Sequence, residues 1–141
     1  MFGVVGAASP AQADSTLEFR LRNVVTGKCL NYNGDNKAVT QVNCKVAKSQ
    51  YWGRSGGDLI TFADPLPSYT CLASPNGHEK QVTTKACYES DPRHTYWQLR
   101  TTALHQKTTV WNGVCGSLKV IAGKVTCGKR MAGDEDNWEI Y

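Results

Sequence analysis

The sequence lacks several patterns, and each absence narrows what the chain can be. No window of a dozen residues repeats its apolar positions every 3.6 residues, so we expect almost no helix. No apolar stretch is long enough to span a bilayer, so we expect no membrane insertion. Cysteine and histidine never occur at Cys-x-x-Cys or His-x-x-x-His spacing, which disfavours zinc as the reason for the six cysteines.

Signs of catalysis and of nucleic-acid binding are also missing. The three histidines, His78, His94 and His105, are scattered, and none stands near a serine or cysteine in a nucleophile motif. The net charge of +4 is mild, and the basic residues do not alternate with aromatic ones as they would on a nucleic-acid platform. We therefore predict a protein that is not an enzyme, uses no cofactor or metal, and does not bind nucleic acid.

What the sequence does contain is a threefold internal repeat. Each copy has a first cysteine, a second cysteine 12 to 16 residues later, and a tryptophan 8 to 11 residues after that. The markers are Cys29, Cys44 and Trp52; Cys71, Cys87 and Trp97; and Cys115, Cys127 and Trp138. Units of about 42 residues bury too little surface to fold alone, so we expect them to share one core. This predicts a single domain at 14–141, with repeats at about 17–56, 57–99 and 100–141.

Residues 1–13 read as the end of a secretory signal peptide. The stretch is short and apolar, and Ala11-Gln12-Ala13 fits the small-residue rule for cleavage. An apolar N-terminal strand is the alternative, and Gly3, Gly6 and Pro10 argue against it. The sequence therefore predicts secretion to the extracellular space.

In a secreted protein an even number of cysteines indicates disulfides, because small secreted domains use disulfides to stabilise small cores. Six cysteines allow 15 pairings. The repeat selects one of them, with a bridge inside each unit: Cys29–Cys44, Cys71–Cys87 and Cys115–Cys127. Each such bridge is expected to stabilise the fold by ~2–4 kcal/mol.

The predicted secondary structure is β throughout. Leu17, Phe19 and Leu21 alternate with charged residues, and further β-rich runs lie at 59–62, 81–84, 108–111, 118–121 and 138–141. Turn dipeptides separate such runs at 33–34, 56–57, 76–77 and 112–113. Four strands per unit give twelve, which can close into a threefold barrel with a hairpin cap. The last strand, from Trp138, would then lie beside the first, from Leu17, and Trp52, Trp97 and Trp138 would meet in the core.

The repeat resembles the ricin-B-type β-trefoil, or R-type lectin, family, in which each unit reads G-x-C-L, then a second Cys, then Q-x-W. Unit 1 has Gly-Lys-Cys-Leu at 27–30 and Gln-Tyr-Trp at 50–52. Unit 2 has Thr-Cys-Leu at 70–72 and Thr-Tyr-Trp at 95–97, and unit 3 has Gly-Val-Cys-Gly at 113–116 and Asp-Asn-Trp at 136–138. The resemblance covers 14–141 and implies an all-β trefoil.

The resemblance also implies where a sugar would bind. Sugar-binding members supply an Asp two residues after the first Cys, an aromatic two before the second Cys, a polar group near it, and an Asn-Gln pair before the Trp. The corresponding residues are Asn31, Val42, Thr40 and Ser49-Gln50 in unit 1; Ala73, Lys85, Thr83 and His94-Thr95 in unit 2; and Ser117, Val125, Gly123 and Glu135-Asp136 in unit 3.

No unit keeps the aspartate or the aromatic residue. A lost hydrogen bond to a charged acceptor costs about 1.5–3 kcal/mol, which is a large part of the binding energy of a monosaccharide. We therefore expect galactose-type binding to be weak or absent. The remaining candidate ligand-binding residues lie in unit 1 and are Asn31, Tyr32, Thr40, Gln50 and Tyr51.

Three functions remain open at this point. The favoured hypothesis is a secreted adaptor that binds a protein partner, such as a subunit of a toxin-like assembly. The alternative is a glycan-binding lectin with an atypical site in unit 1. The third is an enzyme inhibitor of trefoil type that would act through the proline-containing loop at 64–69.

Overall fold

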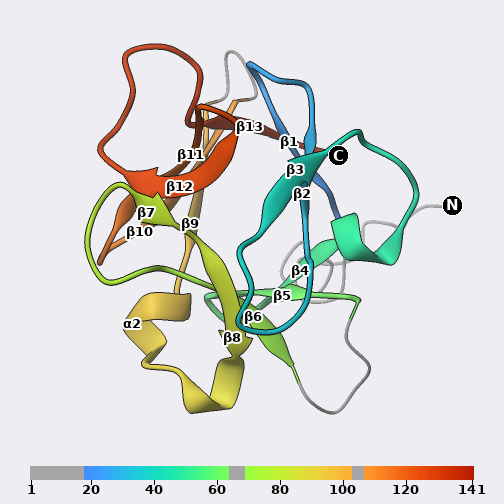
Figure 1. Cartoon of the computed structure of the whole chain (residues 1–141), viewed down its shortest axis with the longest axis vertical. Coiled ribbons are helices and arrows are strands. Elements are labelled where there is room, and N and C mark those ends of the chain that lie inside the picture. The colour runs from blue at the N-terminus through green and yellow to red at the C-terminus, as the bar shows by residue number, and fades with distance from the viewer. Residues whose placement is uncertain (1–17, 64–68, 103–106) are drawn as a thin grey trace, which may run out of the picture.

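The protein is described here by a computed structural model, which covers residues 18–63, 69–102 and 107–141. In these residues thirteen short β-strands form two sheets, one of nine strands and one of four. Figure 1 shows the strands arranged in three groups around a common centre. The predicted signal peptide and most of the predicted inhibitor loop lie outside the described residues.

Each repeat contributes a similar run of short strands. Repeat 1 consists of β1 (Leu21–Asn23), β2 (Cys29–Asn31), β3 (Thr40–Val42), a 3-10 turn η1 (Lys48–Gln50) and β4 (Trp52–Ser55). Repeat 2 consists of β5 (Asp58–Thr61), β6 (Thr70–Ala73), β7 (Lys80–Gln81), β8 (Thr83–Ala86), η2 (Cys87–Glu89), α2 (Pro92–Thr95) and β9 (Gln98–Thr101). Repeat 3 consists of β10 (Thr108–Asn112), β11 (Gly116–Ile121), β12 (Lys124–Gly128) and β13 (Asn137–Ile140).

The strand runs predicted from sequence at 59–62, 81–84, 108–111, 118–121 and 138–141 all overlap strands of the structure. The prediction of twelve strands is one short of the described number. The extra strand is the two-residue β7 of repeat 2, which pairs with β12 of repeat 3 through Gln81 and Thr126. A two-residue strand leaves no periodic signal, because alternation needs at least four residues to be visible.

The first and last strands of the described residues pair with each other, as the barrel prediction requires. β1 pairs antiparallel with β13, with Leu21 opposite Ile140 and Asn23 opposite Trp138. This pairing covers an edge that would otherwise be open to another chain. The first described strand begins at Leu21, and the buried Phe19 forms a separate β-bridge with Trp52; Leu17, where the strand was predicted to begin, lies outside the described residues.

The predicted hairpin turns fall at positions that need glycine. Gly34, between β2 and β3, has a φ of +123°, and Gly77, between β6 and β7, has a φ of +101°. Backbone angles of this sign are readily adopted only by glycine. The Asn-Gly dipeptides therefore mark real turns in repeats 1 and 2.

Three tryptophans occupy the core in equivalent ways. Trp52, Trp97 and Trp138 have no solvent exposure. Each indole Nε1–H donates to a backbone carbonyl: that of Leu30 at 3.2 Å, of Leu72 at 2.9 Å and of Leu118 at 2.9 Å. A buried indole needs such a partner, so these bonds both satisfy and orient the rings.

The three disulfides are those that the repeat selects, with one bridge in each third of the chain: Cys29–Cys44, Cys71–Cys87 and Cys115–Cys127. They close segments with sequence separations of 15, 16 and 12 residues. Each bridge ties together the two cysteine-bearing segments of its own repeat, and these segments flank the positions at which the family resemblance places sugar ligands.

Helix is scarce, as predicted, but one short helix was missed. The single turn α2 begins after Asp91, whose side chain accepts a hydrogen bond from the Arg93 N–H at 2.9 Å, and Pro92 stands at its first position. Asp followed by Pro is a helix-start signal, so the sequence did carry a hint of it. None of the helices in the described part of the chain is long and apolar enough to cross a membrane.

Candidate functional site

The tryptophan hydrogen bonds define which residues are equivalent in the three repeats. Leu30, Leu72 and Leu118 are the three acceptors, so the residues that follow them, Asn31, Ala73 and Lys119, are equivalent. A second set of bonds agrees: the backbone N–H groups of Tyr32, Ser74 and Val120 donate to the carbonyls of Ser49, His94 and Glu135.

This register corrects the assignment of repeat 3 made from sequence. Counting from the first cysteine placed Ser117 at the position of the sugar-binding aspartate, but the structure places Lys119 there. The reason is that the acceptor leucine follows the first cysteine directly in repeats 1 and 2, whereas Leu118 stands three residues after Cys115. The first cysteine of repeat 3 thus lies two positions further from the acceptor leucine than in the other repeats, while the leucine keeps its place in the core.

Repeat 3 is closed to a ligand at this position. The Lys119 side chain is buried, and its ammonium forms an ion pair with Glu79 of repeat 2 at 2.7 Å. Strands β11 and β12 stay paired up to Ile121 and Lys124, so only two residues turn between them. Ser117 and Asp136, which the sequence assigned to a site, hydrogen-bond to each other at 2.9 Å.

Repeat 1 holds the candidate residues chosen from sequence, and three of them form hydrogen bonds with other residues of the β2–β3 hairpin. Asn31 donates to the side chain of Asn33 at 2.8 Å, and Asn33 in turn donates to the Thr40 hydroxyl at 2.9 Å. The Tyr32 hydroxyl donates to Asp35. The structure thus brings Asn31, Tyr32 and Thr40 together on the β2–β3 hairpin. They belong to a polar cluster whose hydrogen bonds are made within that hairpin.

The other two candidates of repeat 1 lie apart from this cluster. Gln50 has no solvent exposure, and its amide accepts from the Lys45 N–H and donates to the Asn43 carbonyl, so it holds the loop before η1. Tyr51 is half-buried, and the Arg20 guanidinium lies 5.3 Å from the centre of its ring. Ligand binding by the five residues of unit 1 stays a prediction.

Repeat 2 has a pocket where repeat 1 has the polar cluster and repeat 3 has Lys119. Its volume is about 290 Å³. The equivalent of Asn31 and Lys119 is the buried Ala73, the residue before Ser74 of the pocket lining. The ten lining residues, which we call the repeat-2 pocket, are Ser74, Pro75, Asn76, Gln81, Thr83, Lys85, Glu89, Ser90, Asp91 and His94. Three of them, Thr83, Lys85 and His94, were assigned to unit 2 from the resemblance.

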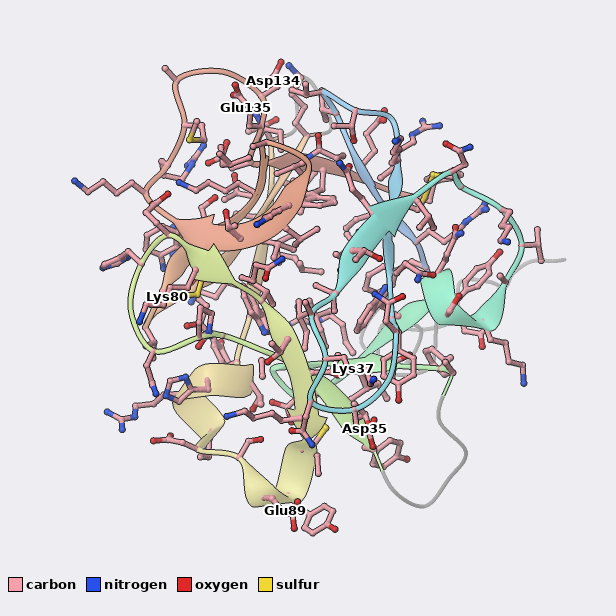
Figure 2. The ribbon with its side chains drawn as sticks, viewed as in Figure 1. Asp35, Lys37, Lys80, Glu89, Asp134 and Glu135 are labelled. Atoms are coloured by element: carbon pink, nitrogen blue, oxygen red, sulfur yellow. A yellow bond between two sulfur atoms is a disulfide. The ribbon has the colours of Figure 1, made fainter. Side chains whose placement is uncertain are left out.

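Several polar side chains of the repeat-2 pocket have no partner among the described residues. These are the side chains of Asn76, Gln81, Thr83, Lys85 and Glu89, which form no hydrogen bond or ion pair there. They comprise one ammonium, one carboxylate, two amides and one hydroxyl. In repeat 1 the counterpart of Thr83, Thr40, accepts a hydrogen bond from Asn33, whereas in repeat 2 these five groups are left for solvent or a ligand. Figure 2 shows Glu89 at the tip of the molecule formed by η2.

The back wall of the repeat-2 pocket is held in place from two sides. The Ser74 hydroxyl and His94 Nδ1 lie 2.9 Å apart, and the Ser74 N–H donates to the His94 carbonyl at 2.8 Å. From repeat 3, the buried Asn112 amide donates to the carbonyls of Arg93 at 2.9 Å and Tyr96 at 2.8 Å. His94 is half-buried, and these contacts fix its position.

Asp91 is a fixed negative charge at the edge of the repeat-2 pocket. Hydrogen bonds from the Arg93 side chain, and then from the Arg93 N–H, lower the pKa of the Asp91 carboxyl to about 2. The carboxylate is therefore ionised at any physiological pH. Two of its roles are structural, because it starts α2 and pairs with Arg93 at 2.7 Å.

Sequence reasoning missed Glu89, Asn76 and Gln81, and no signal in the family pattern pointed to them. They lie in segments between the marker positions and are brought to the pocket by the β6–β8 hairpin and η2. The described lining of the pocket includes no aromatic residue. Tyr88, whose side chain is 77% exposed, stands next to Glu89 in sequence.

Comparison with known proteins gives one family and many similar folds. Residues 17–130 match the family described as ricin-type beta-trefoil lectin domain. A search of curated protein sequences finds no match.

Three similar solved structures illustrate the range of the fold. The designed threefold-symmetric protein ThreeFoil aligns with a TM-score of 0.70 at 15% identity, covering 87% of this chain and 96% of that one. SeviL, solved bound to the asialo-GM1 saccharide, aligns with a TM-score of 0.63 at 16% identity, covering 88% and 95%. The agglutinin from Abrus precatorius aligns with a TM-score of 0.70 at 17% identity, covering 87% of this chain and 47% of that one. At such low identities these likenesses establish the fold, a β-trefoil.

Proposed function

The chain belongs to the ricin-type beta-trefoil lectin domain family, and from this membership we propose that it is a secreted, non-catalytic module that binds a glycan in the repeat-2 pocket. The observation that carries the proposal is the set of five unpartnered polar side chains in a preformed pocket at the family's sugar position. A group that has no partner in the protein loses no internal bond when it binds a hydroxyl, so such a set favours a polyol ligand.

The chemistry of the pocket suits a neutral sugar. The Glu89 carboxylate can accept from two hydroxyls, the Lys85 ammonium can donate to ring or hydroxyl oxygens, and the Asn76 amide can do both. Lys85, Glu89 and Asp91 together give the lining one positive and two negative charges. This balance disfavours an anionic ligand. A volume of about 290 Å³ lies at the lower end of the range for ligand pockets, roughly 300–1,000 Å³, so we expect one sugar unit to enter.

Glycan binding now stands ahead of the adaptor hypothesis. That hypothesis rested on the loss of the family's aspartate and aromatic in every unit. The corrected register of repeat 3 restores no aspartate, but the lining of the repeat-2 pocket includes a carboxylate, Glu89, from outside the family pattern, and this carboxylate can take the part of the missing aspartate. Binding of a protein partner, and inhibition through the loop at 64–69, stay hypotheses from the sequence.

Secretion is part of the proposal. All six cysteines are paired in three disulfides, and such pairing is typical of an oxidising compartment. A lectin acting on extracellular glycans would meet its ligand there. The predicted signal peptide at 1–13 is consistent with this location.

The test is a glycan array probed with the mature chain, followed by calorimetric titration of the best saccharide into three proteins. These are the wild type, Lys85→Met and Glu89→Gln. We expect each substitution to weaken binding at least about tenfold, because each removes a hydrogen bond to a charged group worth about 1.5–3 kcal/mol.

Lys124→Met is the matched control, because Lys124 is an exposed lysine at the β11–β12 turn, away from the pocket lining. It should bind like the wild type. An array without any binder, or equal affinities in all four proteins, would overturn the proposal.

A further inference from the structure

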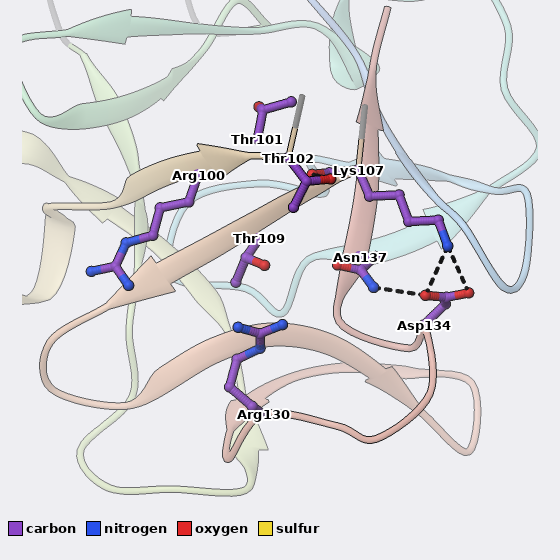
Figure 3. Close-up of a pocket in the computed structure, with 8 residues that line it drawn as sticks. All are labelled: Arg100, Thr101, Thr102, Lys107, Thr109, Arg130, Asp134 and Asn137. Carbon is purple, nitrogen blue, oxygen red and sulfur yellow. Dashed lines mark hydrogen bonds and ion pairs between the residues drawn. The ribbon is translucent and has the colours of Figure 1, made fainter. Parts of the chain in front are cut away.

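A second pocket lies on repeat 3, between strands β9, β10 and the segment that joins β12 to β13. Its volume is about 380 Å³, and Figure 3 shows its lining residues: Arg100, Thr101, Thr102, Lys107, Thr109, Arg130, Asp134 and Asn137. We call it the β9–β10 pocket. It shares no residue with the repeat-2 pocket or with the equivalent positions Asn31, Ala73 and Lys119.

The charge of this lining is opposite in sign to that of the repeat-2 pocket. Arg100, Lys107 and Arg130 are positive, and Asp134 is the one acidic residue among the lining residues, which leaves a net charge of +2. Arg130 also pairs with Asp136 behind the lining, so Arg100 is the cation of the lining without a carboxylate partner among the described residues. Lys107 reaches both oxygens of Asp134 at 3.2 Å, and this pair forms one wall of the pocket.

Arg130 uses only part of its guanidinium for hydrogen bonds within the described residues, and the rest can bind a ligand. Its Nε donates to the buried Asp136 carboxylate at 2.6 Å. Its two Nη groups make no hydrogen bond to the described residues, and Figure 3 shows the guanidinium turned toward Thr109. A guanidinium fixed through Nε presents its remaining N–H groups in a geometry that fits the oxygens of a carboxylate or sulfate.

Thr109 adds a hydroxyl to this lining. The residue is only 8% exposed, and its hydroxyl, which has no hydrogen-bond partner among the described residues, stays open to the solvent of the pocket. An oxygen-rich group in the pocket would accept from it. Arg100 stands at the exposed edge, where its guanidinium donates to the Gln98 side chain.

We propose that the β9–β10 pocket binds an oxyanion, the sulfate or carboxylate group of an acidic saccharide, with Arg130, Lys107, Arg100 and the Thr109 hydroxyl as donors. The pocket is larger than the repeat-2 pocket, so it leaves space for a sugar ring beside the anionic group. The inference does not depend on the proposed function. Glu89 and Asp134 lie at opposite ends of the long axis of the molecule, so the two pockets can be tested separately (Figure 2).

The experiment is a calorimetric titration with three probes: N-acetylglucosamine 6-sulfate, unsulfated N-acetylglucosamine and inorganic sulfate. We expect the sulfated sugar to bind at least about tenfold more tightly than its unsulfated parent, with an affinity that falls as salt rises. Inorganic sulfate that competes for the site with similar affinity would identify a site for a free anion. Sulfate that competes only weakly would identify the saccharide as the source. Equal binding of the sulfated and unsulfated sugars would overturn the proposal.

Three variants locate the site. Thr109→Val keeps the side-chain shape, Arg100→Gln removes an exposed charge, and Arg130→Lys keeps a cation beside Asp136 but removes the planar fork. Each should weaken sulfated-sugar binding at least about threefold, while the thermal midpoint of Thr109→Val and Arg100→Gln stays near that of the wild type. Lys85→Met, in the repeat-2 pocket, is the control and should bind the sulfated sugar normally. A loss in Lys85→Met without a loss in the three variants would place the anion in the repeat-2 pocket and contradict the assignment.

Discussion

The Ser74 hydroxyl lies 2.9 Å from His94 Nδ1, and this contact joins the end of β6 to α2 across the repeat-2 pocket. The equivalent backbone bond, from the Ser74 N–H to the His94 carbonyl, recurs in all three repeats. The side-chain contact is specific to repeat 2, because Tyr32 and Val120 occupy the corresponding positions in repeats 1 and 3. The Ser74–His94 pair therefore combines a backbone hydrogen bond that all three repeats share with a side-chain contact that is specific to repeat 2.

Ser74→Ala tests whether this contact positions His94 for binding. The free energy of unfolding should fall by only about 1 kcal/mol, the usual net value of one hydrogen bond. Affinity for the array-selected glycan should fall about threefold to tenfold, because the imidazole keeps only one of its two Nδ1 contacts, that with the Ser74 carbonyl at 3.1 Å, and is held less firmly. Calorimetry and urea denaturation measure the two quantities. Ser55→Ala, at an exposed serine, is the control, and an unchanged affinity in Ser74→Ala would contradict a positioning role.

Asn112→Ala should destabilise the whole domain. The buried Asn112 side chain accepts from the N–H groups of Val114 and Cys115 and donates to backbone carbonyls of the α2 segment in repeat 2. Its removal leaves several buried backbone groups unpaired, so we expect a loss of at least about 2 kcal/mol in urea unfolding. Asn43→Ala, at an exposed asparagine, should lose almost nothing. Equal losses in the two variants would show that the link between repeats 2 and 3 contributes no stability.

The disulfide of repeat 2 should contribute strongly to stability. Replacing Cys71 and Cys87 together by alanine opens a segment with a sequence separation of 16 residues. For a loop of this length the loss is about 3 kcal/mol, chiefly because the unfolded chain gains freedom. Denaturant unfolding under non-reducing conditions measures it. A double variant as stable as the wild type would mean that this bridge adds nothing to the packed core.

The ion pair between Lys119 and Glu79 should make stability depend on pH in acid. The Lys119 ammonium, and then the Lys129 N–H, lower the pKa of the Glu79 carboxyl in the folded protein from its ordinary value of 4.5. A lowered folded-state pKa stabilises the protein above the unfolded pKa, and this contribution is lost as pH falls through the folded pKa. Because the Glu79 side chain is half-exposed, the effect is smaller than for a fully buried pair.

Glu79→Gln removes the charge and checks this reasoning. The wild type should be the more stable protein at pH 7, and the difference in unfolding free energy should stay constant down to about pH 5 and then shrink. Urea unfolding at a series of pH values gives the comparison. Lys119 has a buried side chain, so the neutral variant leaves its charge without a paired carboxylate. A difference that stays the same from pH 7 to pH 3 would contradict the pKa argument.

The sequence predicted the fold well because its signals are local and repeated. Six cysteines and three tryptophans in register fixed the three units, the disulfides and the core, and Asn-Gly dipeptides marked the turns of repeats 1 and 2. The elements that the sequence did not predict, such as β7 and α2, are too short to show a periodic pattern. Asp91-Pro92 is nevertheless a helix-start signal for α2.

The candidate site was much harder to predict than the fold. Gln50 looked like a ligand because the family pattern names it, but the structure shows its amide bonded to the backbone of its own loop. Glu89 looked like an ordinary surface residue, since only the folded hairpin brings it to Lys85 and His94. In repeat 3, the register depends on which carbonyl accepts from Trp138, and no spacing of cysteines reveals that contact.

An NMR titration shows whether a glycan binds in the repeat-2 pocket. The saccharide selected by the array is added to the isotope-labelled mature chain while assigned backbone amide signals are followed. We expect the largest shifts to cluster at 74–76, 81–85 and 89–94, with small changes elsewhere. Shifts centred on Asn31 and Thr40 in repeat 1, or no shifts with any saccharide, would contradict it.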